Sequence, residues 1–276
     1  MMRRRDVVAR TVLYAVLGVG LLVVAGPFVW MLLSSVKPEA EIRRVPPTWW
    51  PEHFTLANYH ELFSRLDFPR YFANSLIVAV LVTAGNLLFC SALGYALAKL
   101  RFPGRRVLFG LVLGTLMVPG MAVFVPQFVL VSNLNLVNSY AGLVLPFLAG
   151  PFGVFLMRQY LLSIPDELIE AARVDGAGES RIFWRIVLPL CRPALATLGI
   201  LTFLTSWNNF LWPLVVATTE DKYTLPVALA LYSVGQNRLN YGLALAGAVV
   251  VVMPVLIVFV LLQRHFMRGI ATTGLK

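Results

Sequence analysis

The sequence reads Leu76-Ile77-Val78-Ala79-Val80-Leu81-Val82 without a polar residue, inside the 28 residues of Tyr71–Ala98 that include no Asp, Glu, Lys or Arg. A helix that crosses a bilayer needs about 20 mostly apolar residues. A strand of a membrane barrel would instead alternate apolar and polar residues over about ten positions. Because backbone groups in hydrocarbon must be hydrogen-bonded within the chain, this stretch predicts a transmembrane α-helix.

Four further stretches also lack charged residues: Thr11–Val36, Val107–Met157, Pro193–Thr219 and Leu239–Gln263. The second of them has 51 residues, too many for one span, and it divides at a polar turn that contains Asn133, Asn135 and Asn138. The six expected spans lie near 11–33, 73–98, 107–131, 139–158, 194–217 and 241–263. Prolines in or near the spans are expected to kink them: Pro27, Pro119, Pro126, Pro146 and Pro254.

The pattern therefore predicts an all-α, polytopic membrane protein with six transmembrane helices. Its expected parts are a cytoplasmic N-terminus (1–10), a first transmembrane helix (11–33), an external loop (34–72), a core of five helices (73–263) with a cytoplasmic loop (159–192), and a cytoplasmic tail (264–276). Arg3, Arg4 and Arg5 precede the first span. Its apolar stretch exceeds the 7–15 residues of a signal-peptide core and no A-x-A site follows, so we expect a retained helix.

The charge distribution predicts the orientation. The chain has 23 basic and 13 acidic residues, a net charge of +10. With both termini in the cytoplasm, 16 basic and 6 acidic residues fall inside, so the inner side carries the whole surplus. This agrees with the positive-inside rule. The surplus of basic residues is therefore explained by membrane topology rather than by binding of nucleic acid.

The composition excludes several classes of protein. The hydrophobic fraction is 59% and the charged fraction 13%, against about 45–50% and 25% in soluble chains. A cytosolic enzyme, a disordered chain and a collagen-like chain are thereby excluded. Cys90, Cys191 and the three histidines have no metal-ligand spacing, so we expect no metal site.

The expected spans contain no ionisable side chain, whereas proton-coupled carriers depend on such groups. The sequence also has no phosphate-binding loop and no hydrolase motif. We therefore expect a chain that is not an enzyme and binds no cofactor. If its transport is active, the energy comes from another subunit.

The long inner loop has helical signals of its own. Ser163 and Asp166 resemble a capping box around Pro165. Leu168, Ala171 and Ala172 follow the spacing of one helical face, and the expected helix stops at Gly176 and Gly178, before a second short helix at Ser180–Val187. Small residues at its centre suit a helix that docks in a groove of another protein. A surface helix on the membrane or on its own bundle fits the same pattern.

The loop also carries a motif. Glu170-Ala171-Ala172, three residues, Gly176, nine residues and Ile186-Val187-Leu188-Pro189 match the EAA signature at every defined position. The chain thus resembles the permease subunits of bacterial ATP-binding-cassette importers. Three further segments and the tail are similar to the sugar branch, particularly its maltose-permease G type: Gly94–Lys99 with Phe102-Pro103-Gly104, Asn133–Tyr140, Trp207–Leu214 and Gln263–Ile270. The resemblance covers about residue 27 to the end. Many members have an acidic residue at the position of Asn209 and a more glycine-rich tail.

This resemblance implies a type I importer bundle in the bacterial cell membrane. Its expected partners are membrane lipid, a second homologous permease, two cytoplasmic ATPase subunits that bind ATP and Mg²⁺, and an external sugar-binding protein. The motif segment would be the coupling helix, anchored by Glu170, with Ala171 and Ala172 allowing close approach and Gly176 permitting the turn. The implied ATPase-coupling residues are Glu170, Ala171, Ala172, Arg173, Asp175, Gly176, Ile186, Leu188 and Pro189.

Candidates for the sugar path lie in spans five and two. Trp207, Asn208 and Asn209, near Trp212, combine aromatic faces with hydrogen-bonding groups, as sugar recognition requires. Asn86 is a weaker candidate. Packing tryptophans and an Asn pair that bridges helices would explain the same residues.

Two other functions compete with the importer permease. A self-contained secondary transporter or channel would need inverted repeats, and none is evident. A membrane enzyme would need a catalytic cluster, and the only dense group of charges is Asp175, Glu179, Arg181 and Arg185.

Overall fold

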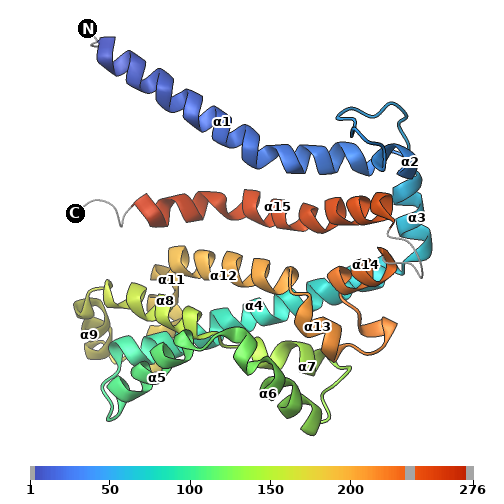
Figure 1. Ribbon diagram of the computed structural model, residues 1–276. Helices are drawn as coiled ribbons and strands as arrows, with labels where there is room; N and C mark the ends of the chain where they lie inside the picture. The colour runs from blue at the N-terminus through green and yellow to red at the C-terminus, as the bar shows by residue number, and fades with distance from the viewer. Residues whose placement is uncertain (1–3, 234–239, 272–276) are drawn as a thin grey trace. The chain divides into compact units, whose positions relative to one another are not determined.

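The computed structural model describes residues 4–233 and 240–271, and every regular element in these ranges is helical (Figure 1). The predicted cytoplasmic ends extend into residues 1–3 and 272–276, which lie outside the described residues. The elements are α1 (Arg4–Ser35), α2 (Glu39–Ile42), α3 (Ala57–Arg65), α4 (Phe68–Lys99), α5 (Arg105–Met117), α6 (Gly120–Asn133), α7 (Tyr140–Val144), η1 (Leu145–Phe147), α8 (Pro151–Leu162), α9 (Asp166–Val174), α10 (Glu179–Ile182), η2 (Phe183–Val187), α11 (Leu188–Leu190), α12 (Arg192–Trp207), α13 (Leu211–Val216), η3 (Glu220–Lys222), α14 (Leu225–Ser233) and α15 (Tyr241–Ala271).

The chain divides into two compact units. The first comprises residues 1–68 and 229–253, and the second comprises residues 69–228 and 254–276. In the first unit, buried polar groups order the predicted external loop. The Lys37 ammonium donates to Thr48 and to the carbonyl of Trp49, and the Asn58 amide donates to the carbonyls of Ser35 and Lys37 at 2.9 and 2.8 Å.

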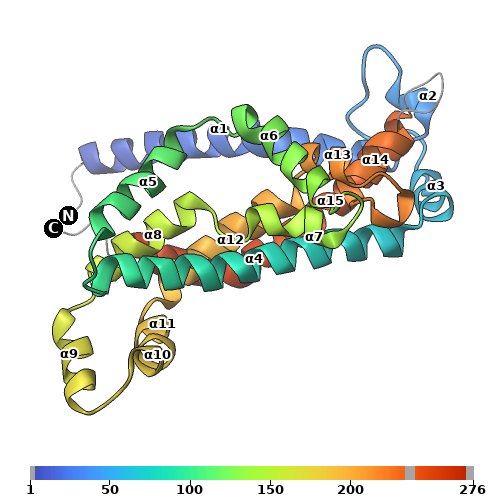
Figure 2. The same cartoon turned by 90° about the horizontal axis from the view of Figure 1, so that it is seen from below.

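The second unit is built around α4. In this unit α9 lies beyond one end of α4, and α7 and α13 lie beside its other half (Figure 1, Figure 2). Glycines bring α4 and α8 into close contact. A Cβ on Gly94 would lie 2.8 Å from Cβ of Met157, and a Cβ on Gly153 would lie 2.7 Å from Sγ of Cys90. Small residues allow such backbone approach between helices in lipid, where dispersion contacts drive association.

The long charge-free stretches form helices, but not all of them are straight. Among the described residues, two helices are long and apolar enough to cross a membrane without a break, α4 and the Arg10–Ser35 part of α1. Up to five spans result if three bent helix pairs count as one span each. The six-span count stays a prediction. The expected span at 107–131 is not straight, because α5 and α6 meet at 104° at Val118 and Pro119; whether the pair is one span stays a prediction. Pro119 cannot continue the hydrogen-bond ladder, so the predicted kink there is confirmed.

The fifth expected span, 194–217, is also interrupted. α12 ends at Trp207 and α13 begins at Leu211. The polar turn predicted at Asn133–Asn138 is confirmed, and Asn135 and Asn138 adopt left-handed conformations with φ of 55° and 57°. Asparagine tolerates this region better than most residues.

The contact between α4 and α8 gives a stability prediction. We expect Gly94→Val to lower the free energy of unfolding by about 1–3 kcal/mol, the usual cost of an overpacked interior. Gly110→Val is the matched control, because no atom lies within 4 Å of a Cβ built there. Thermal melts of the detergent-purified subunit measure both variants, and equal melting temperatures would contradict the close α4–α8 contact.

Candidate functional site

The predicted cytoplasmic loop (159–192) forms a helix where the sequence predicts one. α9 is followed by Gly176, which has a φ of 76°, a left-handed conformation that glycine adopts at no steric cost. The backbone amides of Asp175 and Gly176 donate to the carbonyls of Ala171 and Arg173, each at 3.0 Å. Gly176 therefore ends the helix and turns the chain, as predicted.

The predicted capping box at the start of this helix is wrong. Ser163 is the C-cap residue of α8, and its hydroxyl donates to the carbonyl of Tyr160 at 2.7 Å. Pro165 occupies the N-cap position of α9 without a side-chain cap. Asp166 instead pairs with Lys99 of α4, at 2.5 Å.

The faces of α9 differ from the single apolar face that the spacing predicts. Ile169 and Ala172 are buried against the second unit's own core. Leu168, Ala171 and Val174 are exposed, and Val174 is 87% exposed. Ile169 rather than Leu168 is thus the inward anchor. We call Leu168, Ala171 and Val174 the outer face of α9; Glu170, Arg173 and Asp175 are also exposed.

Two polar side chains of α4 hold the loop, and the sequence analysis missed both. Lys99, whose side chain is 5% exposed, donates to the carbonyl of Ile164 at 2.6 Å and to Asp166. One turn earlier on α4, the Tyr95 hydroxyl donates to Glu179 Oε2 at 2.6 Å. The segment before α9 and the segment after it are therefore both tied to the end of α4. The signal was the i, i+4 spacing of Tyr95 and Lys99, which places them on one face of a helix.

The charges of the loop fit these contacts. The Arg173 guanidinium donates to Glu179 Oε1 at 2.7 Å, and together with the Tyr95 hydroxyl it lowers the pKa of Glu179. The hydrogen bond from Lys99 lowers the pKa of Asp166 in the same way. Both carboxylates are therefore ionised at neutral pH and keep their partners. Arg173, a predicted coupling residue, thus contacts its own loop.

The last part of the motif follows α10. η2 is a π-helical turn that ends at Val187. Pro189, in α11, has no N–H to donate to the carbonyl of Arg185. Ile186 and Leu188 are half-buried and pack against the same core as α9, whereas Pro189 is exposed. These three motif residues shape the return of the chain to α12.

A second candidate site lies deeper in the second unit, between α4, α8, α12 and α13. It is a cavity of about 300 Å³, and its lining includes Asn86, Asn209 and Trp212 from the predicted sugar path. Thr202, Thr205 and Ser206 also line it, and sequence reasoning missed them. Thr205 and Ser206 follow Thr202 by three and four positions on α12, and the three residues therefore lie on one helical face, which was the available signal. No charged side chain lines this cavity.

Asn86 uses its amide to hold a helix break. Its Nδ2 donates to the carbonyls of Val82 and Phe147 at 3.1 and 2.6 Å, and its Oδ1 accepts from the Gly150 amide at 3.0 Å. Phe147 is the last residue of η1, and Gly150 is the N-cap residue of α8. Asn86 thus satisfies backbone groups that the break leaves unpaired. Its amide lies at the wall of the cavity and is occupied by these hydrogen bonds.

The other predicted sugar-path residues do not all line the cavity. Trp207 is 1% exposed and packs on Phe72 and Phe203, with ring centroids 5.5 and 5.8 Å away. It does not line the cavity. Asn208 is exposed and donates to the carbonyl of Leu204 at 2.9 Å. Only Asn209 of the pair lines the cavity, in the break between α12 and α13.

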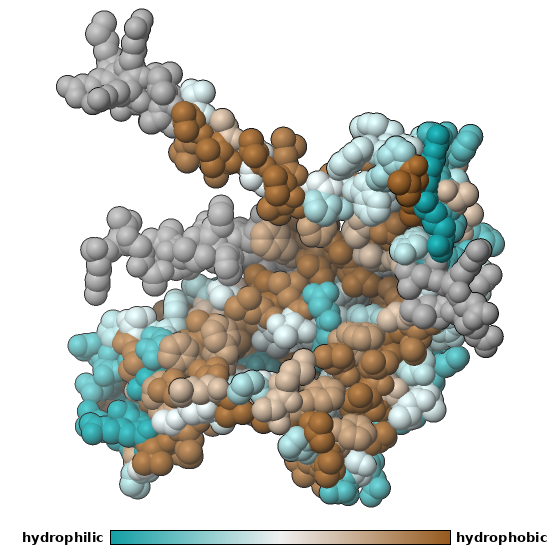
Figure 3. All heavy atoms as spheres, viewed as in Figure 1, coloured by the Kyte–Doolittle hydropathy of each residue, from teal (hydrophilic) through white to brown (hydrophobic). Residues whose placement is uncertain are grey.

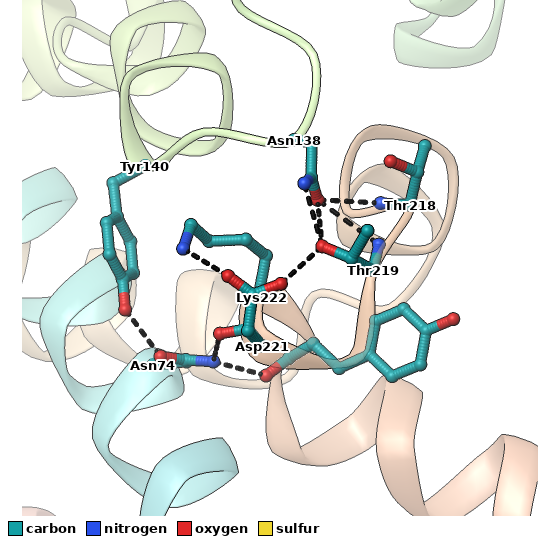
Figure 4. Close-up of polar contacts among 8 residues, drawn as sticks. Asn74, Asn138, Tyr140, Thr218, Thr219, Asp221 and Lys222 are labelled. Atoms are coloured by element: carbon teal, nitrogen blue, oxygen red, sulfur yellow. Dashed lines mark hydrogen bonds and ion pairs between the residues drawn. The ribbon is translucent and has the colours of Figure 1, made fainter.

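The end of α4 opposite to α9 carries a polar cluster (Figure 4). Asn74 Nδ2 donates to the carbonyls of Asp221 and Tyr223 at 3.0 and 2.8 Å, and its Oδ1 accepts from the Tyr140 hydroxyl at 2.5 Å. Asn138 accepts from the amides of Thr218 and Thr219, at 3.1 and 3.2 Å. These contacts hold the segment after α13 against α4 and α7.

α4 therefore contacts three parts of the second unit: the segment after α13 at Asn74, the break before α8 at Asn86, and the loop that contains α9 at Tyr95 and Lys99. Figure 3 shows apolar side chains over the middle of this unit and hydrophilic ones at the end where α9 lies. Helices long and apolar enough to cross a membrane, an uncharged cavity and a loop helix with an exposed outer face are the features of a polytopic membrane permease.

Comparisons with known proteins give its family. The chain belongs to the family of binding-protein-dependent transport system inner membrane components, which matches residues 90–272. It is 41% identical to the arabinooligosaccharides transport system permease protein AraQ of Halalkalibacterium halodurans, over 91% of this chain and 90% of that protein. It is 35% identical to the diacetylchitobiose uptake system permease protein NgcG of Streptomyces coelicolor, over 90% and 83%.

A solved structure agrees. A chain in the crystal structure of a bacterial ABC transporter involved in the import of the acidic polysaccharide alginate aligns with a TM-score of 0.86 and 27% identity, covering 96% of this chain and 99% of that chain. The protein is therefore the multi-pass plasma-membrane translocation subunit of a carbohydrate ABC importer, of the maltose-permease G type. Such permeases work with an ATPase and a binding protein. Because the chain belongs to this family, the alternative prediction of a self-contained secondary transporter or channel is not supported.

Proposed function

We propose that α9 is the coupling helix of this importer and that its outer face docks in a cleft of a separate ATPase subunit. The observation that carries the proposal is the division of α9 into a buried face, Ile169 and Ala172, and an exposed face of small and apolar residues. A nine-residue helix is marginal alone in water, but here α4 holds both of its ends. An exposed apolar face on a fixed helix suits a protein partner.

The full assembly that we propose has a second homologous permease, two ATPase subunits and an external sugar-binding protein. ATP and Mg²⁺ would bind the ATPase subunits, and this chain would carry no catalytic residue. Closure of the ATPase pair would move α9, and the contacts of Lys99 and Tyr95 would pass that movement to α4. Because α4 also holds Asn74 at its other end, one rigid helix would link the two sides of the transport path.

Co-purification tests the docking. We expect the affinity-tagged chain to bring down a second membrane chain and an ATPase. Val174→Asp should lose the ATPase but retain the second permease, because a buried unpaired carboxylate disfavours an apolar contact. Val174→Ala is the matched control and should retain both. Retention of the ATPase by Val174→Asp would contradict docking through the outer face.

We also propose that the cavity at Asn86, Asn209 and Trp212 forms this chain's part of the sugar path. Its lining offers hydroxyl, amide and aromatic groups and no charge, which suits an uncharged glycan. AraQ and NgcG are named for arabino-oligosaccharides and diacetylchitobiose. In reconstituted transporter we therefore expect neutral oligosaccharides to be taken up in preference to uronic-acid oligosaccharides.

A change of volume tests the path. Ser206→Phe fills part of a cavity of about 300 Å³, so we expect sugar uptake to fall at least about tenfold, a difference of roughly 1.4 kcal/mol. ATPase activity stimulated by the binding protein should persist. Ser206→Ala leaves the space open and should transport at the wild-type rate. Equal uptake by both variants would remove this cavity from the path.

A further inference from the structure

Two cavities border the loop that joins α4 to α5. The first has a volume of about 400 Å³ and is lined by Arg101, Phe102, Gly104, Arg105, Arg106 and Val107. The second has a volume of about 300 Å³ and is lined by eight apolar side chains of α4, α5, α8 and the connecting loop, with Thr115 at one end. Phe102 lines both, so the polar pocket and the apolar groove border the same side chain.

We propose that the pocket and the groove together bind one anionic phospholipid. The phosphate of the headgroup lies among Arg101, Arg105 and Arg106, and an acyl chain lies in the groove between Leu93 and Leu111. No function proposed above uses these residues.

The charge of the pocket selects an anion. Its lining has three arginines and no acidic side chain. Arg106 is exposed and makes no ion pair within the part of the chain that the structure describes. Arg105 donates from Nη1 to the carbonyl of Leu100 at 3.0 Å, which leaves its other donors available. Planar guanidinium groups bind phosphate oxygens through paired hydrogen bonds.

Neighbouring acidic groups do not neutralise this pocket. Arg101 and Arg105 also border a cavity that contains Asp166 and Glu170. Asp166 already pairs with Lys99 at 2.5 Å. Four basic and two acidic side chains line this third cavity, so the positive surplus persists there too.

The depth of the site fits a lipid better than a soluble anion. The groove residues belong to the charge-free stretches Tyr71–Ala98 and Val107–Met157, and the arginines lie between these stretches. The boundary between hydrocarbon and headgroups is therefore expected near Phe102, on the predicted cytoplasmic side. Anionic lipids are enriched in that leaflet, and basic pockets between transmembrane helices bind their headgroups. α5 itself buries no residue within the chain, so the groove is open along its side.

The test uses the assembled transporter, this chain with its partner permease and ATPase subunits, in detergent with equal amounts of phosphatidylglycerol and phosphatidylcholine. Native mass spectrometry counts the lipids that remain bound. We expect the wild type to retain phosphatidylglycerol in preference. Arg106→Gln should weaken retention about fivefold, the effect of one arginine near an anionic surface. Arg10→Gln, which also removes an exposed arginine from the predicted inner side, should leave retention unchanged.

A second variant tests the groove without changing charge. Ala96→Phe fills the apolar groove and should lower retention of both lipids; if it fails to assemble, Arg106→Gln carries the test. Equal retention of the two lipids by the wild type would overturn the proposal, as would equal retention by Arg106→Gln and Arg10→Gln. Lipid bound here by the isolated chain but absent from the assembled transporter would show that a protein subunit covers the groove instead, and would also overturn it.

Discussion

Replacing Ala171 by Trp uncouples sugar uptake from ATP hydrolysis while the permease still reaches the membrane: this is the largest effect that we expect. Ala171 lies on the exposed outer face of α9, where a large side chain leaves the chain's own core intact but separates the helix from a close partner. An overpacked contact costs about 1–3 kcal/mol, which weakens the association roughly 5- to 150-fold. Uptake and ATPase rates in proteoliposomes measure the loss.

The adjacent alanine provides the contrast. Ala172 is 8% exposed and packs in the core with Ile169, so Ala172→Trp should lower the melting temperature of the subunit as well as its transport. Ala171→Ser keeps the residue small and should behave as the wild type. Normal coupling in Ala171→Trp, or a loss of stability equal to that of Ala172→Trp, would contradict the assignment of the two faces.

The second large effect concerns the two α4 side chains that hold the coupling loop. We expect the double variant Tyr95→Phe/Lys99→Met to assemble with the ATPase but to transport roughly tenfold less sugar per ATP. Each lost charge-assisted hydrogen bond costs about 1.5–3 kcal/mol, and without both contacts α9 can move independently of α4. Uptake and hydrolysis measured in the same vesicles give the ratio.

The single variants complete a double-mutant cycle. Tyr95→Phe leaves Glu179 paired with Arg173, so its effect alone should be small, and Lys99→Met should have the larger effect. Lys222→Met removes a lysine from the polar cluster at the opposite end of α4 and controls for the loss of charge. An unchanged ratio of transport to hydrolysis in the double variant would remove α4 from the coupling pathway.

The features that depend on local physics could be predicted from the sequence. Charge-free length predicted the apolar helices, the asparagine turn follows from residues that tolerate positive φ, and Gly176 ends α9 by its own conformational freedom. Pro119 breaks the third span for an equally local reason, although the lack of charge along 107–131 concealed the size of the bend.

Long-range packing decided the rest. Lys99 and Tyr95 precede their partners Ile164 and Glu179 by 65 and 84 positions. Because these contacts fix the rotation of the loop, the inward residue of α9 is Ile169. Asn86 and Asn209 line one cavity only because α4 and α12 pack in the same unit. Trp207 and Trp212 look alike in sequence, yet only Trp212 lines that cavity, since Trp207 packs between Phe72 and Phe203. No spacing rule separates them.

The central claim is that the outer face of α9 contacts the ATPase. Cross-linking from a single cysteine tests it most directly, and the native thiols, Cys90 and Cys191, are both buried. In the assembled transporter, Val174→Cys carrying a short photoreactive cross-linker should join this chain to an ATPase subunit in high yield. The same probe on Leu134→Cys, an exposed position on the turn after α6, should not. A cross-link from Leu134→Cys and none from Val174→Cys would contradict the account.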